Sequence, residues 1–185
     1  MMQELSMNIM DVAENSVRAG ASIIEITVDE KPSADFLTVT ISDNGCGMSH
    51  EQIKSVIDPF YTTRSTRKVG LGVPFFKMAA ELTGGTFLIE SEVGKGTVVK
   101  ASFVRSSIDL MPLGNINETI SSLIYCNPQI DFVYTRRFED NEMTLDTREF
   151  RIILGGIELN EPSVSKFIRD FLAENTSDLL SGLEA

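Results

Sequence analysis

An acidic residue at the end of an alternating apolar segment is the first feature of this sequence that could form part of a ligand-binding site. Asp43 continues the alternation of Leu37, Val39 and Ile41, so its side chain should point to the apolar side of a sheet. A carboxylate there is costly unless it meets hydrogen-bond donors, and the exocyclic amine of adenine is such a donor. A simple Asp-Asn-Gly turn between a strand and a helix is the alternative interpretation.

Closely spaced glycines occur at two places. Gly45 and Gly47 follow Asp43, permit positive φ and would let the backbone approach a flat ring. Gly70 and Gly72 precede an expected helix, where unfilled backbone N–H groups attract phosphate oxygens. An ordinary loop-to-helix junction would also explain the second pair.

A polar stripe on the expected first helix carries a candidate metal ligand. Asn15 lies one turn beyond Asp11, and both face away from the apolar stripe of the helix. Magnesium prefers oxygen ligands and keeps several waters, so one amide oxygen together with phosphates can hold it. A surface asparagine is the alternative interpretation.

A basic segment interrupts an otherwise acidic chain of 185 residues and net charge −11. Arg64, Arg67 and Lys68 lie among the hydroxyls of residues 62–66, which favours a small polyanion as partner, although a solvated loop has the same composition. The acidic balance disfavours nucleic-acid binding.

Composition indicates a globular chain rather than a membrane or disulfide-stabilised protein. No apolar run is long enough to span a bilayer, and no secretory signal precedes the first helix. The two cysteines, Cys46 and Cys126, lie far apart and indicate neither a disulfide framework nor a zinc site. We expect a cytoplasmic protein.

Hydrophobic periodicity predicts alternating helices and strands up to about residue 106. Ser6 is expected to cap a first helix ending near Arg18, and Ser49 with Gln52 to form a capping box. Strands are predicted over residues 23–29, 36–42, 86–92 and 97–104, and helices over 49–57 and 73–82.

In order and spacing, the chain resembles the GHKL ATPase superfamily of gyrase, heat-shock chaperone, histidine-kinase and mismatch-repair nucleotide-binding domains. The segments that carry the resemblance are residues 11–21 (DVAENSVRAGA), 43–47 (DNGCG), 59–64 (PFYTTR), 69–72 (VGLG) and 94–97 (GKGT). The resemblance covers about residues 1–106 and nothing beyond.

The resemblance implies an α+β fold, a two-layer α/β sandwich whose mixed sheet is covered by helices on one face. It also implies ATP held by Asp43, magnesium held by Asn15, and a flexible lid between about Tyr61 and Gly72. The nucleotide-binding residues that it implies are Asn15, Asp43, Gly45, Gly47, Thr63, Arg64, Arg67, Lys68, Gly70, Leu71, Gly72 and Thr97.

The chain departs from this family at two places. Many hydrolytic members carry glutamate where Asp11 stands, four residues before Asn15. Asp11 is shorter by about 1.5 Å of reach, which makes it a candidate catalytic base of reduced efficiency. Histidine kinases carry their phospho-acceptor histidine on a helical hairpin before the ATP-binding domain, whereas only a few residues precede the first helix here. The one histidine, His50, is expected to be an exposed residue at a helix start. We therefore expect any phospho-acceptor to belong to another chain or to be another residue type. The short layout resembles, more loosely, serine kinases of the anti-sigma-factor type.

Residues 107–185 are expected to form a small α+β C-terminal extension without metal or catalytic groups. Helices are predicted over 116–125 and 162–174, and a hairpin over 132–138 and 144–154. Phe132 and Tyr134 look exposed, but the aromatic and aliphatic positions, including Phe167 and Phe171, favour core over partner surface. The extension should pack on the ATP-binding domain or form a second lobe that binds a partner or another copy.

Three functions are compatible with these features. The first is a kinase that passes the γ-phosphoryl of ATP to a partner protein. The second is a switch in which ATP orders the lid with little turnover. The third is a purely structural α/β domain, which leaves the glycine and basic segments without an explanation.

Overall fold

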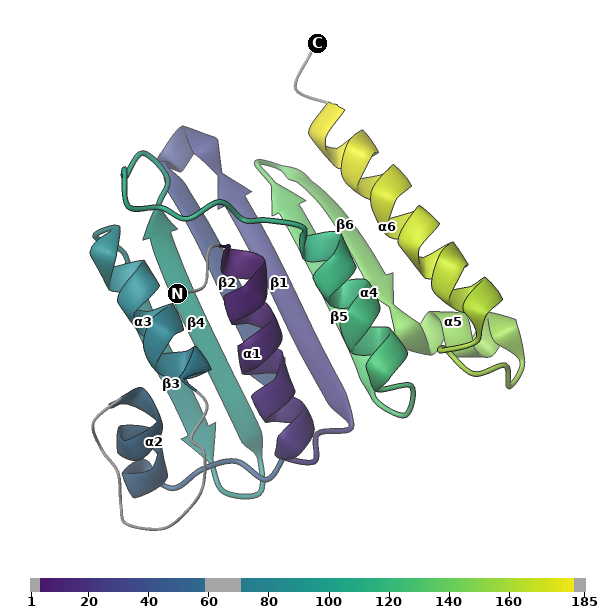
Figure 1. Ribbon diagram of the computed structural model, residues 1–185, viewed down its shortest axis with the longest axis horizontal. Coiled ribbons are helices and arrows are strands. Elements are labelled where there is room, and N and C mark those ends of the chain that lie inside the picture. The colour runs from purple at the N-terminus through teal and green to yellow at the C-terminus, as the bar shows by residue number, and fades with distance from the viewer. Residues whose placement is uncertain (1–3, 59–70, 182–185) are drawn as a thin grey trace.

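A single six-stranded mixed sheet, covered on one face by helices, organises the chain (Figure 1). The computed structural model describes residues 4–58 and 71–181. The strands follow the order β3-β4-β2-β1-β5-β6, and only the β1–β5 pair is parallel. The α+β, two-layer arrangement predicted from the sequence is therefore confirmed.

Apart from a short 3-10 helix that the sequence does not predict, η1, the elements up to residue 104 match the predicted ones within a few residues. They are α1 (Leu5–Arg18), β1 (Ile23–Lys31), the short 3-10 helix η1 (Pro32–Ala34), β2 (Phe36–Asp43), α2 (His50–Ile57), α3 (Gly72–Leu82), β3 (Thr86–Glu92) and β4 (Gly96–Val104). The capping box at the start of α2 is present, with Ser49 and Gln52 bonded reciprocally. Inward-facing residues of the strands alternate with outward-facing ones, so α1 and α3 cover an apolar face.

The predicted role of Ser6 as the cap of α1 is wrong. The helix begins at Leu5 with Glu4 at its N-cap position, and the Ser6 hydroxyl donates to Glu4 Oε2 at 3.2 Å. The first helical N–H groups, those of Leu5 and Ser6, instead donate to the carbonyls of Pro112 and Leu113, each at 2.9 Å. A segment remote in sequence thus satisfies the end of this helix.

The C-terminal residues extend the same sheet. After α4 (Ile116–Cys126), strand β5 (Asp131–Phe138) pairs with β1 in parallel, and β6 (Asn141–Asp146) adds the outer strand. Of the two arrangements expected for this extension, the structure has the one in which it packs on residues 1–106. The domain boundary at residue 106 stays a prediction. Phe132 and Tyr134, which look exposed in the sequence, are buried at 1% and 0% exposure.

The prediction that residues 144–154 form the second strand of a C-terminal hairpin is partly wrong. Residues 147–154 form helix α5 (Thr147–Leu154), and α6 (Pro162–Ser181) is longer than predicted. The Asp146 carboxylate accepts the Arg148 N–H at 2.9 Å and so caps α5. The Arg148 guanidinium beside it holds the pKa of Asp146 below its usual range.

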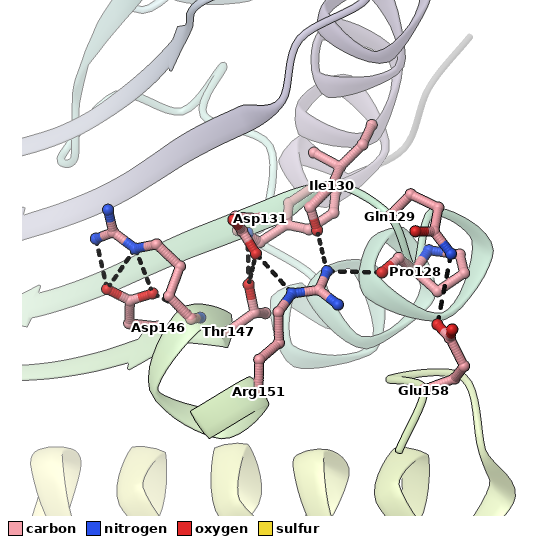
Figure 2. A network of polar contacts seen from close by, with 10 residues as sticks. Pro128, Gln129, Ile130, Asp131, Asp146, Thr147, Arg151 and Glu158 are labelled. Carbon is pink, nitrogen blue, oxygen red and sulfur yellow. Dashed lines mark hydrogen bonds and ion pairs between the residues drawn. The ribbon is translucent and has the colours of Figure 1, made fainter. Parts of the chain in front are cut away.

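Arg151 joins α5 to the connection between α4 and β5 (Figure 2). Its Nε donates to Asp131 Oδ1 at 2.8 Å, and its Nη2 donates to the carbonyls of Pro128 at 2.6 Å and Ile130 at 3.2 Å. Thr147 Oγ1 accepts the Phe132 N–H at 2.9 Å. These bonds hold α5 against the start of β5.

Replacing Arg151 with methionine should lower the free energy of unfolding by about 1–3 kcal/mol, because two carbonyls and a carboxylate lose their donor. Urea denaturation monitored by circular dichroism measures the change. The matched control is Arg148→Met on the same helix, whose exposed side chain binds only at the helix start, and which should shift the midpoint far less. Equal shifts for the two variants would contradict this account.

Candidate functional site

A pocket of about 330 Å³ lies where the C-terminal half of α1 meets the ends of β2 and β4. Its walls come from α1, the turn after β2, α2, α3 and the β3–β4 pair. The lining residues are Val12, Asn15, Ser16, Arg18, Ala19, Asp43, Cys46, Gly47, Met48, Val56, Val73, Ile89, Thr97 and Val99.

Asp43 is the acidic group of this pocket and lies on the helix side of the sheet, as the strand alternation predicts. Its Oδ2 accepts the Ser16 hydroxyl at 2.6 Å, and its Oδ1 accepts the Gly45 N–H at 2.8 Å. A carboxylate has about four lone-pair sites, so two donors hold its orientation and leave it able to accept further hydrogen bonds.

The turn after Asp43 is clamped between two other parts of the chain. Asn44 Oδ1 accepts the N–H groups of Ser22 at 2.9 Å and Ile23 at 3.1 Å. Cys46 N–H donates to the Ala19 carbonyl at 2.9 Å, and its own carbonyl accepts the Gly94 N–H at 2.8 Å. The pocket floor is therefore tied to the end of α1 and to the β3–β4 turn.

The glycines of this turn are required by contacts within the protein. Gly47 has φ of +65°, and a Cβ there would lie 2.0 Å from the Glu92 carbonyl oxygen. A Cβ at Gly45 would lie 2.8 Å from the Ala19 Cβ. Close packing against Glu92 and Ala19 explains both positions, and the approach of this turn to a ligand ring stays a prediction.

The first helix supplies two pocket residues that sequence reasoning did not single out. Ser16 is buried at 4% exposure on the apolar face of α1, yet its hydroxyl donates to Asp43 Oδ2. Arg18 forms an ion pair with Glu14 at 2.9 Å and also lines the pocket. A hydroxyl on an otherwise apolar stripe was the available signal for Ser16.

Asp11 contacts the start of α3 and is not among the residues that line the pocket. A Cβ added to Gly72, the first residue of α3, would lie 2.6 Å from the Asp11 Cβ and 3.0 Å from its Oδ2. Leu71, at the N-cap position of α3, is 48% exposed. The carboxylate thus lies near the positive end of the α3 dipole, a favourable electrostatic position.

The predicted nucleotide-binding residues divide into three groups. Asn15, Asp43, Gly47 and Thr97 line the pocket. Gly45 lies in the turn after β2, Leu71 and Gly72 lie at the start of α3, and none of these three is among the lining residues. Five others fall outside the described residues: Thr63, Arg64, Arg67, Lys68 and Gly70.

Comparison with known proteins identifies the family. Residues 1–107 match the family described as histidine kinase-, DNA gyrase B- and HSP90-like ATPase. The chain belongs to this ATPase family. The resemblance carried by the five sequence segments is thereby confirmed, and the first part of the chain is an ATP-binding domain of this type.

Among curated relatives, the sensor protein SrrB of Staphylococcus aureus is 38% identical over 101 residues. The match covers 52% of this chain but only 17% of that protein, so the chain spans a small part of its relative. Among solved structures, the N-terminal domain of a DNA repair protein shares the fold, with a TM-score of 0.51 at 13% identity over 78% of this chain and 52% of that one. The Aquifex aeolicus MutL ATPase domain complexed with ADP has a TM-score of 0.47 at 15% identity, over 77% and 64% of the two chains.

The acceptor group and the apolar walls of the pocket in this ATPase domain are suited to a nucleotide. Apolar side chains from α2, α3, β3 and β4 surround the acceptor Asp43, as a purine ring with an exocyclic amine requires. Among the described residues, no hydrogen bond engages the side-chain amide of Asn15. Those residues also hold no group of three or more His, Cys, Asp or Glu side chains placed to bind a metal. Within the described ranges, no helix has the length and apolarity to cross a membrane.

Gly47→Ala should lower the free energy of unfolding far more than Gly94→Ala, because both positions have positive φ but only Gly47 faces a backbone carbonyl. The positive φ alone costs about 1–2 kcal/mol, and relieving the contact with Glu92 adds about 1–3 kcal/mol. Chemical denaturation of the two variants measures the difference. Similar losses would show that the close approach to Glu92 is unimportant.

Proposed function

We propose that this chain is a Mg-ATP-binding regulatory protein that transfers the γ-phosphoryl group of ATP to a partner protein. The observation that carries the proposal is the pair Asp43 and Asn15 in one pocket, with the Asp43 carboxylate oriented by Ser16 and Gly45. The proposal includes a cytoplasmic location and an acceptor outside this chain, with a second copy of the chain as another candidate partner.

Asp43 supports selection of adenine. An ionised carboxylate only accepts hydrogen bonds, and the Ser16 hydroxyl and the Gly45 N–H occupy one lone-pair site on each of its oxygens. Its remaining sites match the amine of adenine and repel the carbonyl oxygen that guanine has at the corresponding position. Val73, Ile89 and other apolar residues lining the pocket would contact the ring.

Asn15 supports the magnesium assignment. Its amide lines the pocket without a hydrogen-bond partner among the described residues, and an amide oxygen is a ligand of the kind that Mg²⁺ takes together with phosphates. When bound, the ion would neutralise charge on the phosphate oxygens. Arg18 at the pocket wall, with Arg64, Arg67 and Lys68 beyond the described residues, would add positive charge around the same phosphates.

Asp11 is the candidate base for the transfer. In that step the acceptor oxygen bonds to the γ-phosphorus, the bond to the β–γ bridging oxygen breaks, and the acceptor proton passes to Asp11 as ADP leaves. Most of the rate would come from positioning and charge neutralisation. Asp11 lies one turn before Asn15 on α1, which puts the two on the same side of the helix.

A non-catalytic or slowly hydrolysing switch is the second candidate, and the contact between Asp11 and Gly72 favours it. A side chain engaged at the start of α3 is suited to reporting the position of that helix and of the lid residues before it. ATP would then shift the chain toward one lid arrangement, and a partner would recognise that arrangement.

Asp43→Ala should weaken ATP binding by about 10- to 100-fold, since a hydrogen bond to a charged group is lost. Isothermal titration calorimetry with Mg-ATP measures the effect, and GTP should bind the unaltered chain much more weakly than ATP. Asp170→Ala, an exposed carboxylate on α6, is the matched control and should leave the affinity unchanged. Unaltered ATP affinity in Asp43→Ala would overturn the nucleotide site.

Asp11→Ala separates the two candidate functions. For a kinase or ATPase, steady-state ATP turnover should fall by about 10²-fold or more, with Mg-ATP affinity retained. For a switch, the unaltered chain should bind ATP without turnover and without phosphorylating proteins captured with it. Turnover that persists in Asp11→Ala would remove this residue from the mechanism.

A further inference from the structure

An apolar surface lies where α5 meets the first half of α6, at the end of the sheet formed by β6 (Figure 1). Phe150 of α5 contacts Phe167 and Phe171 of α6, with ring centroids 5.8 and 5.5 Å apart. Ile153 lies one turn beyond Phe150 on α5, and Ile152 is the residue before it. We call these five residues the α5–α6 face.

The α5–α6 face is unusually exposed for its composition. Ile152 and Ile153 are 82% and 79% exposed, and among the described residues only one large hydrophobic side chain, Ile108, is more exposed. Phe167 is 56% exposed, although its spacing in the sequence predicts a core position. Helix propensity does not explain the two isoleucines, because Lys, Gln and Glu are better helix formers than Ile. A connected apolar surface of this kind marks a site that binds another molecule.

The carboxylates beside this face have no cationic partner in the structure. Glu149 lies on the side of α5 that carries the two isoleucines, and Glu174 lies one turn beyond Phe171 on α6. Both glutamates are exposed. Within residues 4–58 and 71–181, no Lys or Arg forms an ion pair with either of them. The α5–α6 face therefore has an acidic margin.

The cations of the same two helices are engaged elsewhere. Three of them form ion pairs: Arg148 with Asp146, Arg151 with Asp131, and Lys166 with Asp170. Arg169 donates to Ser165 Oγ at 3.2 Å and lines a cavity between α6 and α4, on another side of α6. These cations thus leave the charge of Glu149 and Glu174 without compensation, in a chain of net charge −11.

The acidic margin selects among the molecules that could cover the face. A second copy of the chain would bring carboxylates to carboxylates, and an anionic membrane surface would repel them. A helix with apolar residues along one side and Lys or Arg beside them would cover the isoleucines and neutralise the glutamates at once. Apolar residues at helical spacing on α5 and α6 also form the ridges against which a further helix packs.

We propose that the α5–α6 face binds a basic amphipathic helix of another protein. Ile152, Ile153 and Phe167 contact the apolar side of that helix, and Glu149 and Glu174 pair with its basic residues. The face lies outside residues 1–107 that match the ATPase family, and its role does not depend on what the nucleotide pocket does.

The test is fluorescence anisotropy of the full chain with a labelled synthetic helix of Leu and Lys, about 18 residues or five turns long, with all leucines on one side. Two further peptides are compared with it. One carries Glu in place of Lys, and the other has the same composition without an apolar side. Each should bind more weakly than the Leu–Lys helix by about 10-fold or more.

Ile153→Asp should weaken binding of the Leu–Lys helix by about 10-fold or more, because a charge replaces an apolar contact. Phe167→Gln tests the other helix of the face and should act in the same direction. Glu149→Gln combined with Glu174→Gln should weaken binding a few-fold and reduce its dependence on salt. The matched control is Ile108→Asp, the same exchange at an exposed isoleucine outside the face. It adds the same negative charge and should leave the affinity unchanged.

Circular dichroism and Mg-ATP affinity should be unchanged in all these variants, which separates the face from the nucleotide pocket. Equal binding of the three peptides, or equal affinity in Ile153→Asp and Ile108→Asp, would overturn the proposal. Self-association in sedimentation equilibrium that Ile153→Asp abolishes would assign the face to a second copy instead. Binding to vesicles of phosphatidylcholine and phosphatidylglycerol that Ile153→Asp abolishes would assign it to a lipid surface.

Discussion

The hydrogen bond from Ser16 to Asp43 joins the helix and the strand on which the nucleotide pocket depends. It connects the C-terminal half of α1 to the last residue of β2, over 2.6 Å and 27 residues of sequence. Because Asn15 and Arg18 lie on the same turns of α1, the bond also sets where an amide oxygen and a guanidinium stand relative to the carboxylate. A partly buried carboxylate whose two oxygens already accept hydrogen bonds is less free to rotate, so the pocket is organised before a ligand arrives.

The turn after β2 extends this organisation into the sheet. Its glycines allow the chain to pass within contact of the Glu92 carbonyl and the Ala19 side chain, and Ser91 accepts the Met48 N–H at 2.8 Å. The same Ser91 hydroxyl lies 2.8 Å from Thr97 Oγ1. Strand β4, the turn and the helix therefore form one connected polar network around an otherwise apolar pocket.

Local sequence patterns predict much of this structure. The features that they miss depend on contacts between residues far apart in the sequence. Alternation placed Asp43 on the helix side of β2, and helical spacing placed Asn15 on the side of α1 that borders the pocket. Nothing local indicates that carbonyls of Pro112 and Leu113 satisfy the start of α1, or that β5 pairs with β1 across about a hundred residues. The sequence predicts a strand over residues 144–154 because a short apolar segment has no decisive period, whereas the Asp146 cap starts a helix at Thr147. Ser16 lies on the buried face of α1, so its position alone does not distinguish a packing role from its hydrogen bond to Asp43.

The parallel pairing of β5 on β1 also bears on how the chain can be divided. Without β5, the N–H and C=O groups along one side of β1 would lack ladder partners, and such an unprotected edge is a template for intermolecular strand addition. The match to the ATPase family ends at residue 107, but the same sheet continues beyond it through β5 and β6. A chain shortened to the residues that match the ATPase family would therefore expose β1 as an unpaired edge strand. Pairing with β5 removes that edge and so protects the sheet against aggregation.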